Sequence, residues 1–257
     1  MPDVLCYMDA QNDTIGGHEI AAVSVRSPFI VRTAESLGQA AGWTAAPFRR
    51  LGKRTIWSLE DDLFLVVYLM VAGRYHWKRA DTKPTRKSDL LAIHFEHGAL
   101  MVTEVGARKR ASLHILHSEA ELQAFDLCGL EPLECAEEDF RVRLAGENHT
   151  LKRALTNPRM LSGIGNTYSD EILHAARLSP FRLTSKLQDE EWVRLYGAMQ
   201  AVLSEWVGRL ACDGTLPDRV TAYRKEMAVH GRYGEPCPVC ATKVQRISYA
   251  DGEINYC

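Results

Sequence analysis

Three short stretches of the chain carry residue types that could perform chemistry or hold a ligand. In chain order they are Pro2 and Asp3, the turn at residues 163–166, and Cys237, Cys240 and Cys257. These are candidates, in turn, for amine and acid catalysis, for anion binding and for metal binding. The rest of the chain must supply the elements that position them.

The turn Gly163-Ile164-Gly165-Asn166 lies between two helical patterns. The first pattern ends at Asn157-Pro158, because proline disfavours a helical conformation in the residue before it. The two glycines permit positive φ and a close backbone approach. The cap-type and acidic residues 169–171 are expected to start the second helix, so the turn predicts Asn166 near a helix entrance.

A helix entrance of this kind is a natural anion site. Its backbone amides lack acceptors within the helix, and the positive end of the helix dipole adds to their effect. Lys152 and Arg153 are expected to add mobile positive charge, and phosphate is the expected anion. The same spacing also fits an ordinary helical hairpin with a glycine turn, and the residues alone do not separate the two.

The amino end offers a different chemistry. Removal of Met1 would leave Pro2 as a secondary amine, which titrates near pH 8 and is therefore partly neutral at about pH 7. Such an amine can attack the anomeric carbon of a nucleotide, expel the base and form an iminium that promotes strand cleavage. Asp3 could protonate the sugar ring oxygen. Both residues are also ordinary in a first helical turn, which is the simpler explanation from residue types alone.

The carboxy end has the spacing of a metal site. Cys237-Pro-Val-Cys240 lies at a turn, and Cys257 follows the hairpin pattern RISYADGEINYC. A zinc ribbon holds its metal with two cysteine knuckles, and three of the four thiolates are present here. We therefore expect zinc at these cysteines, with His230 as an alternative fourth ligand. A redox pair, or a chance pair of cysteines, is the competing explanation.

Length and composition set the limits. The chain has 257 residues, 46% of them hydrophobic, which can bury the core of one large domain or two lobes. Its formal charge of −2 gives no global attraction to nucleic acid, so DNA binding needs local basic patches. Without a membrane-spanning run or signal peptide, a cytoplasmic protein is expected. Four scattered cysteines are expected to be reduced core residues: Cys6, Cys128, Cys135 and Cys212.

Strand patterns dominate the first half of the chain. Residues 20–31 are strand-like, residues 47–75 predict a hairpin that turns at Asp61-Asp62, and residues 90–105 predict another that turns near His97-Gly98. We expect a mostly β amino-terminal lobe with a short leading helix. A basic cluster suited to DNA backbone contact lies in the first hairpin: Arg49, Arg50, Lys53 and Arg54. In the second half, residues 185–210 predict a long amphipathic helix with its tryptophans in the core.

Three segments resemble the formamidopyrimidine-DNA glycosylase and endonuclease VIII family. They are KRALTNPRMLSGIGNTYSDEILHAARLSP, LGKRTIWSLEDDLFLVVYLMVAGR and LCGLEPL. The resemblance spans nearly the whole chain and implies an α+β fold of two lobes. The implied domains are an amino-terminal β-sandwich with a leading helix (1–118), a linker (119–135), a helix-two-turn-helix DNA-binding lobe (136–228) and a partial zinc-ribbon hairpin (229–257).

The resemblance also implies a function. A member of this family would excise oxidised bases from damaged double-stranded DNA and cleave the strand as an abasic-site lyase, acting as a monomer with a structural zinc. The implied catalytic residues are Pro2, Asp3 and Lys53. The implied DNA-binding residues are Lys53, Arg108, Lys109, Arg110, Lys152, Gly165 and Asn166. The implied zinc ligands are Cys237, Cys240 and Cys257, with the fourth ligand missing from this chain.

Two departures from the family pattern leave alternatives open. Pro2-Asp3-Val4 matches the second half of the family's Pro-Glu-Leu-Pro-Asp start better than the first half. Gly252 or Glu253 stands where a hairpin arginine is expected, which should weaken the grip on DNA. One alternative is a noncatalytic DNA-binding relative that has lost its amino-terminal motif. Another is a fragment of a longer active enzyme.

Overall fold

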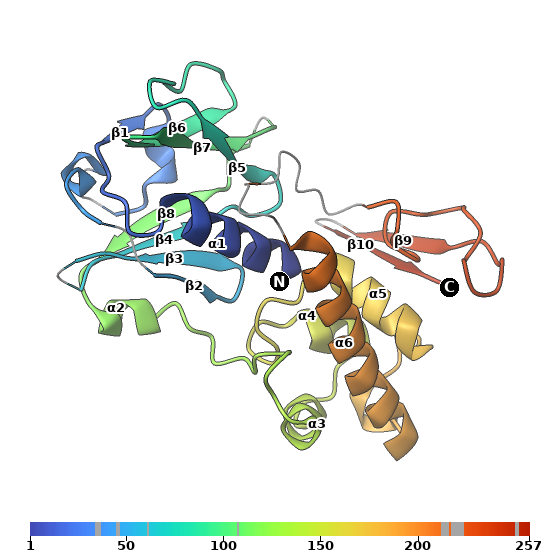
Figure 1. The fold of residues 1–257 in the computed structure, drawn as a ribbon. Helices are drawn as coiled ribbons and strands as arrows, with labels where there is room; N and C mark the ends of the chain where they lie inside the picture. The colour runs from blue at the N-terminus through green and yellow to red at the C-terminus, as the bar shows by residue number, and fades with distance from the viewer. Residues whose placement is uncertain are drawn as a thin grey trace. The chain divides into compact units, whose positions relative to one another are not determined.

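A computed structural model describes residues 1–33, 37–44, 47–60, 62–106, 108–211, 216, 224–249 and 252–257 (Figure 1). The helices are α1 (Pro2–Ile15), α2 (Glu119–Gln123), α3 (Glu137–Ala145), α4 (Leu151–Thr156), α5 (Asn166–Ala176) and α6 (Asp189–Leu210), with short 3₁₀ helices η1 (Pro28–Ile30), η2 (Leu37–Ala40) and η3 (Thr184–Lys186). The strands are β1 (Ala22–Val25), β2 (Phe48–Leu51), β3 (Arg54–Ser58), β4 (Phe64–Tyr68), β5 (Gly73–Lys78), β6 (Asp89–Phe95), β7 (Gly98–Glu104), β8 (Ser112–Leu116), β9 (Gln245–Tyr249) and β10 (Gly252–Tyr256). Asp61 of the predicted turn and Cys212 lie outside the described residues.

The chain divides into two compact units. The amino-terminal unit comprises Pro2–Asp126 and Leu210–Val220, and the carboxy-terminal unit comprises Met1, Leu127–Arg209 and Thr221–Cys257. The division after Asp126 falls inside the segment 119–135 that was predicted as a linker. The predicted domain boundaries stay predictions.

The amino-terminal unit contains two antiparallel four-stranded sheets, with strand orders β1-β6-β7-β5 and β2-β3-β4-β8 (Figure 1). Both sheets contribute to one buried apolar cluster, with Trp57 and Leu65 from one sheet and Leu91 and Val102 from the other. Because successive strand residues face opposite sides, Ile56 instead joins a second cluster with Leu122 of α2. The predicted β-sandwich is therefore confirmed.

The leading helix α1 belongs to this sandwich. Its buried residues recur at helical spacing, and they include Pro2, Cys6, Ala10 and Ile15. The first predicted strand is shorter than expected, because β1 ends at Val25 and a 3₁₀ turn starts at Pro28, which has no N–H to donate to a sheet.

The predicted hairpins form in this unit. Strand β2 pairs with β3 across a turn at Gly52-Lys53, and β3 pairs with β4. Strand β6 pairs with β7 around Glu96 and His97, as the spacing predicts. Lys53 is therefore a turn residue of the first hairpin.

The carboxy-terminal unit carries the predicted helical pair, α4 and α5, and the hairpin of β9 and β10. Helix α6 buries a stripe at helical spacing that includes both predicted core tryptophans: Trp192, Leu195, Met199, Leu203 and Trp206. Within the described part of the chain, no helix is long and apolar enough to cross a membrane.

Two expectations about this half of the chain are wrong in detail. Helix α5 begins at Asn166 after the N-cap residue Gly165, so the cap-type and acidic residues 169–171 lie inside the helix. All three are buried, which means that they serve tertiary contacts instead of a cap. Among the cysteines expected in the core, Cys6 is buried, but Cys128 is exposed and Cys135 is half-buried.

Candidate nucleic-acid interface and metal centre

In the turn between α4 and α5, Gly163 has the positive φ that the sequence predicts, whereas Gly165 is extended. Gly163 adopts a φ of +85°, a conformation that side chains disfavour, and Gly165 is the N-cap of α5. Asn166 is therefore the first helical residue. Backbone N–H groups of a first helical turn have no acceptor within the helix, so this turn presents donors beside the positive end of the α5 dipole.

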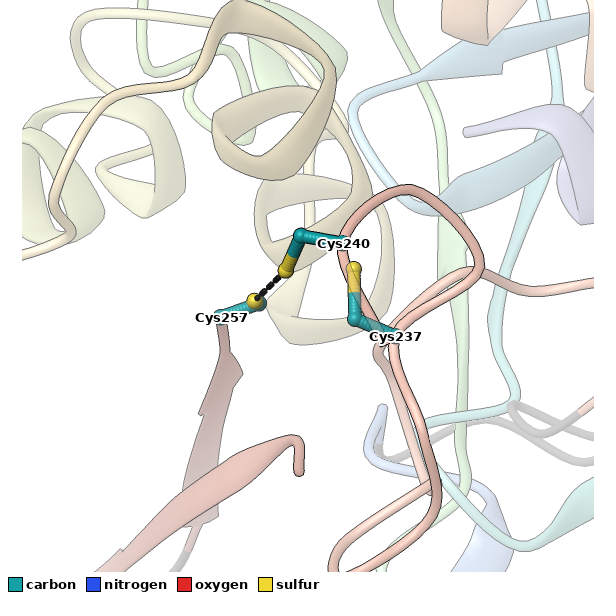
Figure 2. A group of neighbouring side chains, drawn as sticks. All are labelled: Cys237, Cys240 and Cys257. Carbon is teal, nitrogen blue, oxygen red and sulfur yellow. Dashed lines mark hydrogen bonds between the residues drawn. The ribbon is translucent and has the colours of Figure 1, made fainter. Parts of the chain in front are cut away.

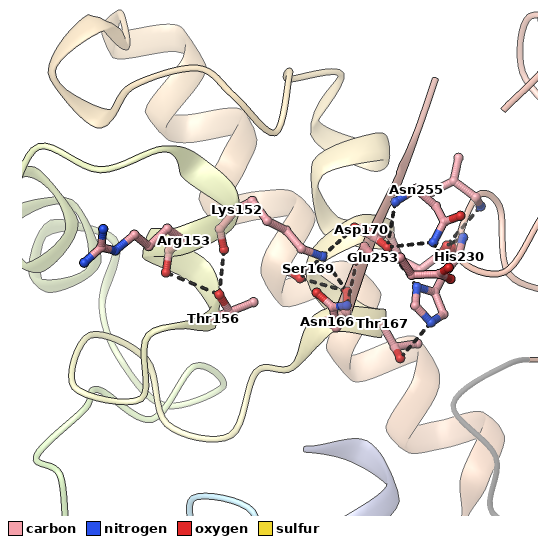
Figure 3. A network of polar contacts seen from close by, with 12 residues as sticks. Lys152, Arg153, Thr156, Asn166, Thr167, Ser169, Asp170, His230, Glu253 and Asn255 are labelled. Atoms are coloured by element: carbon pink, nitrogen blue, oxygen red, sulfur yellow. Dashed lines mark hydrogen bonds and ion pairs between the residues drawn. The ribbon is translucent and has the colours of Figure 1, made fainter. Parts of the chain in front are cut away.

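The side chain of Asn166 is fixed against strand β10 (Figure 3). Its Nδ2 atom donates a 2.7 Å hydrogen bond to the backbone carbonyl oxygen of Glu253. A side-chain Cβ at the neighbouring Gly252 would lie only 3.2 Å from the same Nδ2 atom, so glycine allows this close packing. Gly252 and Glu253, where an arginine was expected from the sequence, therefore hold the side-chain amide of Asn166 in place.

The carboxylate of Glu253 has its own partners. Its Oε1 accepts a 3.0 Å hydrogen bond from Asn255, and its Oε2 lies 3.8 Å from a guanidinium nitrogen of Arg246. Arg246 also stacks 4.5 Å from the ring centroid of Tyr233. The cation on strand β9 therefore partly offsets the acidic charge that was expected to repel phosphate.

Lys152 is not the mobile cation that the sequence suggested. Only 4% of the residue is exposed, and its ammonium lies 2.5 Å from a carboxylate oxygen of Asp170. It also donates to the Ser169 hydroxyl at 2.8 Å and to the backbone oxygen of Asn166 at 2.7 Å. Burial lowers the pKa of Lys152, and the Asp170 charge opposes that shift. Lys152 therefore stabilises the first turn of α5 through buried contacts. Arg153, in contrast, is exposed.

Asp170 is the centre of a buried network that joins α5 to the carboxy-terminal segment (Figure 3). Its second oxygen lies 2.8 Å from Nδ1 of His230 and accepts a 3.1 Å hydrogen bond from the backbone N–H of Asn255. The other ring nitrogen of His230 lies 3.2 Å from the hydroxyl of Thr167. His230 is thus occupied in the network, and among the described residues the group that could hold a metal does not include it.

Glu171 fastens the same segment at a second point. Its carboxylate accepts hydrogen bonds from three successive backbone N–H groups, those of Ala228, Val229 and His230, at 2.7 to 3.0 Å. A buried carboxylate needs such donors to replace its lost water. Helix α5 therefore binds residues 228–230, in the chain segment that leads into the cysteine cluster.

The basic cluster of the first hairpin belongs to the amino-terminal unit, and part of its charge is engaged. Arg49 pairs with Glu119 at 2.7 Å, and Arg54 stacks 5.2 Å from the ring centroid of Tyr68. Lys53 follows Gly52, whose φ is +62°, in the two-residue turn, and it is half-buried. The turn places Lys53 at the end of the hairpin.

The second basic group, Arg108 to Arg110, lies in the loop between β7 and β8. The buried carboxylate of Glu104 accepts from the backbone N–H groups of Arg110 at 2.9 Å and Ala111 at 3.1 Å. The ammonium of Lys109 donates to the backbone oxygen of Glu104. Arg108 and Arg110 are exposed. Glu104 therefore anchors a loop in which both arginines are exposed.

Pro2 and Asp3 form the start of α1 in the amino-terminal unit. Pro2 is buried and Asp3 is half-buried in the first turn of the helix. Both residues therefore lie in a first helical turn, as their residue types predict. The positive end of the α1 dipole lies at these residues.

The three predicted zinc ligands meet in space (Figure 2). The sulfur atoms of Cys237, Cys240 and Cys257 all lie within 4.8 Å of one another, and those of Cys240 and Cys257 are 3.2 Å apart. Sulfurs around a tetrahedral zinc with 2.3 Å bonds would be about 3.8 Å apart, so the donor set fits zinc in chemistry and spacing.

Hydrogen bonding favours a thiolate in the cluster. Hydrogen bonds from Thr242 and Cys257 lower the pKa of Cys240 to about 7, and in return Cys240 raises the pKa of Cys257 to about 12. Cys237 is buried, and its sulfur accepts a 3.4 Å hydrogen bond from the backbone N–H of Val239. The cluster can therefore bind a metal ion.

Sequence reasoning missed several residues that build these sites. Asp170 and Glu171 were expected to start the helix, His174 was given no role, and Glu104 was taken as part of a strand. A signal was present, because Asn166, Asp170 and His174 are spaced four residues apart and so share one helix face. Polar residues at that spacing on one helix face indicate a polar contact.

Comparison with known proteins identifies the fold. A family model of the formamidopyrimidine-DNA glycosylase N-terminal domain matches residues 1–113, and one of the formamidopyrimidine-DNA glycosylase H2TH domain matches residues 128–213. The formamidopyrimidine-DNA glycosylase of Desulfitobacterium hafniense (strain DSM 10664 / DCB-2) is 32% identical over 222 residues, covering 81% of this chain and 78% of that protein. This chain belongs to the formamidopyrimidine-DNA glycosylase family.

Two further relatives agree with the family. An uncharacterized formamidopyrimidine-DNA glycosylase-like protein of Mycobacterium tuberculosis is 39% identical over 129 residues, covering 50% of this chain and 81% of that protein. The crystal structure of the Lactococcus lactis formamidopyrimidine-DNA glycosylase, bound non-covalently to DNA with an AP site, matches with a TM-score of 0.87 and 26% identity. That match covers 100% of this chain and 97% of the other. A DNA repair glycosylase is thus supported as the class of this protein.

Proposed function

We propose that this protein excises oxidised bases from damaged double-stranded DNA and then cleaves the strand at the abasic site. The observation that carries the proposal is the fixed Asn166 at the start of α5, inside the segment that matches the H2TH domain of the glycosylase family. A side-chain amide and backbone N–H groups at a helix start are suited to hold a DNA phosphate. The binding of the Lactococcus relative to AP-site DNA supports the same ligand.

The proposed nucleophile is the amine of Pro2 after removal of Met1. Its nitrogen forms a bond to C1′ of the damaged nucleotide, the bond from C1′ to the base breaks, and the base leaves with the proton that the attacking amine gives up. Asp3 protonates the ring oxygen as the sugar opens, which leaves an iminium between Pro2 and C1′. The iminium acidifies the C2′ proton, which passes to water. The electron pair left at C2′ forms a C2′–C3′ double bond as the bond from C3′ to the phosphate oxygen breaks and the phosphate leaves. This elimination cleaves the strand.

The proposed grip on DNA uses the charges that both units present. Lys53 at its hairpin turn is proposed to contact a phosphate beside the lesion, and Arg108, Lys109 and Arg110 are proposed to contact DNA where the damaged nucleotide is extruded. Gly165 lets the backbone approach a phosphate closely. Lys152 takes part indirectly, since it holds the first turn of α5.

We also propose that the cysteine cluster binds zinc. Cys237, Cys240 and Cys257 would hold it as thiolates, and the ion would serve as a structural cross-link between the knuckle and the end of β10. The spacing of the three sulfurs and the low pKa of Cys240 support this assignment.

Borohydride trapping tests the chemistry. The full chain is incubated with a duplex that contains an abasic site, the iminium is reduced, and mass spectrometry locates the adduct. We expect an adduct at Pro2, and we expect Pro2→Gly to slow cleavage while DNA affinity is kept. Pro84→Gly, at a half-buried loop position, is the matched control.

Other outcomes have definite meanings. An adduct on another residue would refute Pro2 as the nucleophile. Tight abasic-DNA binding without any adduct would refute the lyase activity and leave a noncatalytic DNA-binding protein.

A further inference from the structure

Helix α5 presents three polar side chains in a row to the carboxy-terminal segment. Asn166 donates to the backbone of Glu253, and Asp170 accepts from the backbone of Asn255. The third, His174, lies one more turn along the helix, and its Nε2 atom is 3.3 Å from the sulfur of Cys237. The row therefore runs from the proposed phosphate site at one end of α5 to the cysteine cluster at the other.

The sulfur of Cys237 has a setting unlike those of its two partners. Cys237 is 4% exposed and packs with Val229 and Val244, whereas Cys240 and Cys257 are exposed. A buried thiolate loses its water, so it needs hydrogen-bond donors from the protein. The described contacts of this sulfur include two nitrogen atoms, the backbone N–H of Val239 at 3.4 Å and the ring of His174 at 3.3 Å.

We propose that His174 is a positioning residue that donates its Nε2–H to the Cys237 thiolate and so holds the metal centre on α5. This role rests on the proposed zinc site. Hydrogen bonds to a metal ligand fix its orientation and tune its donor strength, and their loss typically weakens metal binding by about 10- to 100-fold. His174 acts through the sulfur: among the described residues, the group that could hold a metal consists of the three cysteines without it.

The arrangement also links zinc to DNA binding. Asn166 and His174 lie on the same rigid helix, and both contact the segment that ends in Cys257. A metal centre that is loosened from α5 would loosen the strand β10 that fixes the Asn166 amide. We therefore expect loss of the His174 contact to lower DNA affinity as well as zinc affinity.

The test is zinc affinity measured on the full chain, by competition with a chromophoric chelator, for wild type and three variants. His174→Phe removes the donor, and His174→Gln keeps an N–H close to the position of Nε2. His149→Phe is the control, since His149 lies in the same unit and its ring bonds to Glu147. We expect His174→Phe to bind zinc about 10- to 100-fold more weakly, and His174→Gln and His149→Phe to stay within about threefold of wild type.

Cobalt substitution separates a donor from a ligand. If His174 only donates to the sulfur, the d–d absorption bands of the Co²⁺ form keep their position in His174→Gln, whereas a lost nitrogen ligand would shift them. A shift would overturn the proposal, as would unchanged zinc affinity in His174→Phe or equal weakening in His174→Gln. Failure of the wild-type chain to bind zinc would instead refute the zinc site itself, and the role of His174 with it.

Discussion

The side-chain amide of Asn166 donates a 2.7 Å hydrogen bond to the backbone carbonyl oxygen of Glu253, which joins the start of α5 to strand β10. The contact spans 87 residues of sequence and fixes the amide before any ligand arrives. Pre-ordering of this kind reduces the entropy lost on binding. The acceptor is a backbone atom, so the identity of side chain 253 is not what holds Asn166.

We predict that Asn166→Ala weakens binding to undamaged and to abasic duplexes alike. Loss of a charge-assisted hydrogen bond to a phosphate should cost about 1 to 3 kcal/mol, without sequence dependence. Fluorescence anisotropy at fixed salt measures the affinity. Asn148→Ala, at an exposed position of the same unit, is the matched control. Equal affinity of Asn166→Ala and wild type would remove Asn166 from the DNA interface.

The pair formed by Lys152 and Asp170 should be strongly coupled, because side-chain exposure is 5% for the lysine and 0% for the aspartate. Asp170→Asn leaves a buried ammonium without its counter-charge, which should lower the free energy of unfolding by about 3 to 5 kcal/mol. Lys152→Met should also destabilise the protein, and the double variant should lose less than the sum of the two single losses. Urea unfolding of all three variants measures this. Additive losses would show that the pair is not coupled.

The ring of His114 in β8 should make the amino-terminal unit less stable in acid. Burial lowers its pKa in the folded state, and Arg54 and Arg32 lower it further. As pH falls below the unfolded value of about 6.5, the unfolded state binds the proton first, so the free energy of unfolding decreases until the folded pKa is reached. We predict a smaller decrease between pH 7 and pH 5 for His114→Asn, measured by urea unfolding. His117→Asn, an exposed neighbour, should keep the wild-type slope.

Glu104 should decide whether the basic loop 108–110 is ordered. Its carboxylate accepts two backbone N–H groups of that loop, and a single hydrogen bond to a charged group is worth about 1.5 kcal/mol, equivalent to an about tenfold larger open fraction. We predict that Glu104→Ala is cleaved at least about tenfold faster by trypsin after Arg108, Lys109 or Arg110. Glu96→Ala, in an exposed turn, is the control. Unchanged cleavage would mean that other contacts hold the loop.

The elements that position the sites were largely readable from local pattern. Period-two and period-3.6 hydrophobicity predicted the hairpins of the amino-terminal unit and helix α6, because those periods follow directly from strand and helix geometry. The glycines of the turn predicted a helix entrance at Asn166, since few other residues adopt the φ of Gly163. The spacing of Cys237 and Cys240 predicted a knuckle, and the strand-like stretch after it predicted that Cys257 would return to it.

Local sequence pattern did not predict the surroundings of polar residues that could either face solvent or be paired in the core. Lysine is a residue type usually found at the surface. Lys152 is nevertheless buried, because its ammonium pairs with the carboxylate of Asp170 on the next helix. His230 looked available as a metal ligand, yet Asp170 and Thr167 occupy its two ring nitrogens. Ser169 and Asp170 looked like helix caps, yet they lie one turn inside α5.

What the sequence alone determined is the set of local elements, the residue types at each candidate site and the resemblance to a glycosylase family, all of which depend on neighbours in the chain. What only the tertiary structure decided is which polar groups meet. Asp170 and Asn255 are separated by 85 residues, and no local period constrains their approach. Such pairs form because burying an unpaired charge is unfavourable. A buried carboxylate must therefore accept hydrogen bonds from whichever donors the fold brings near it.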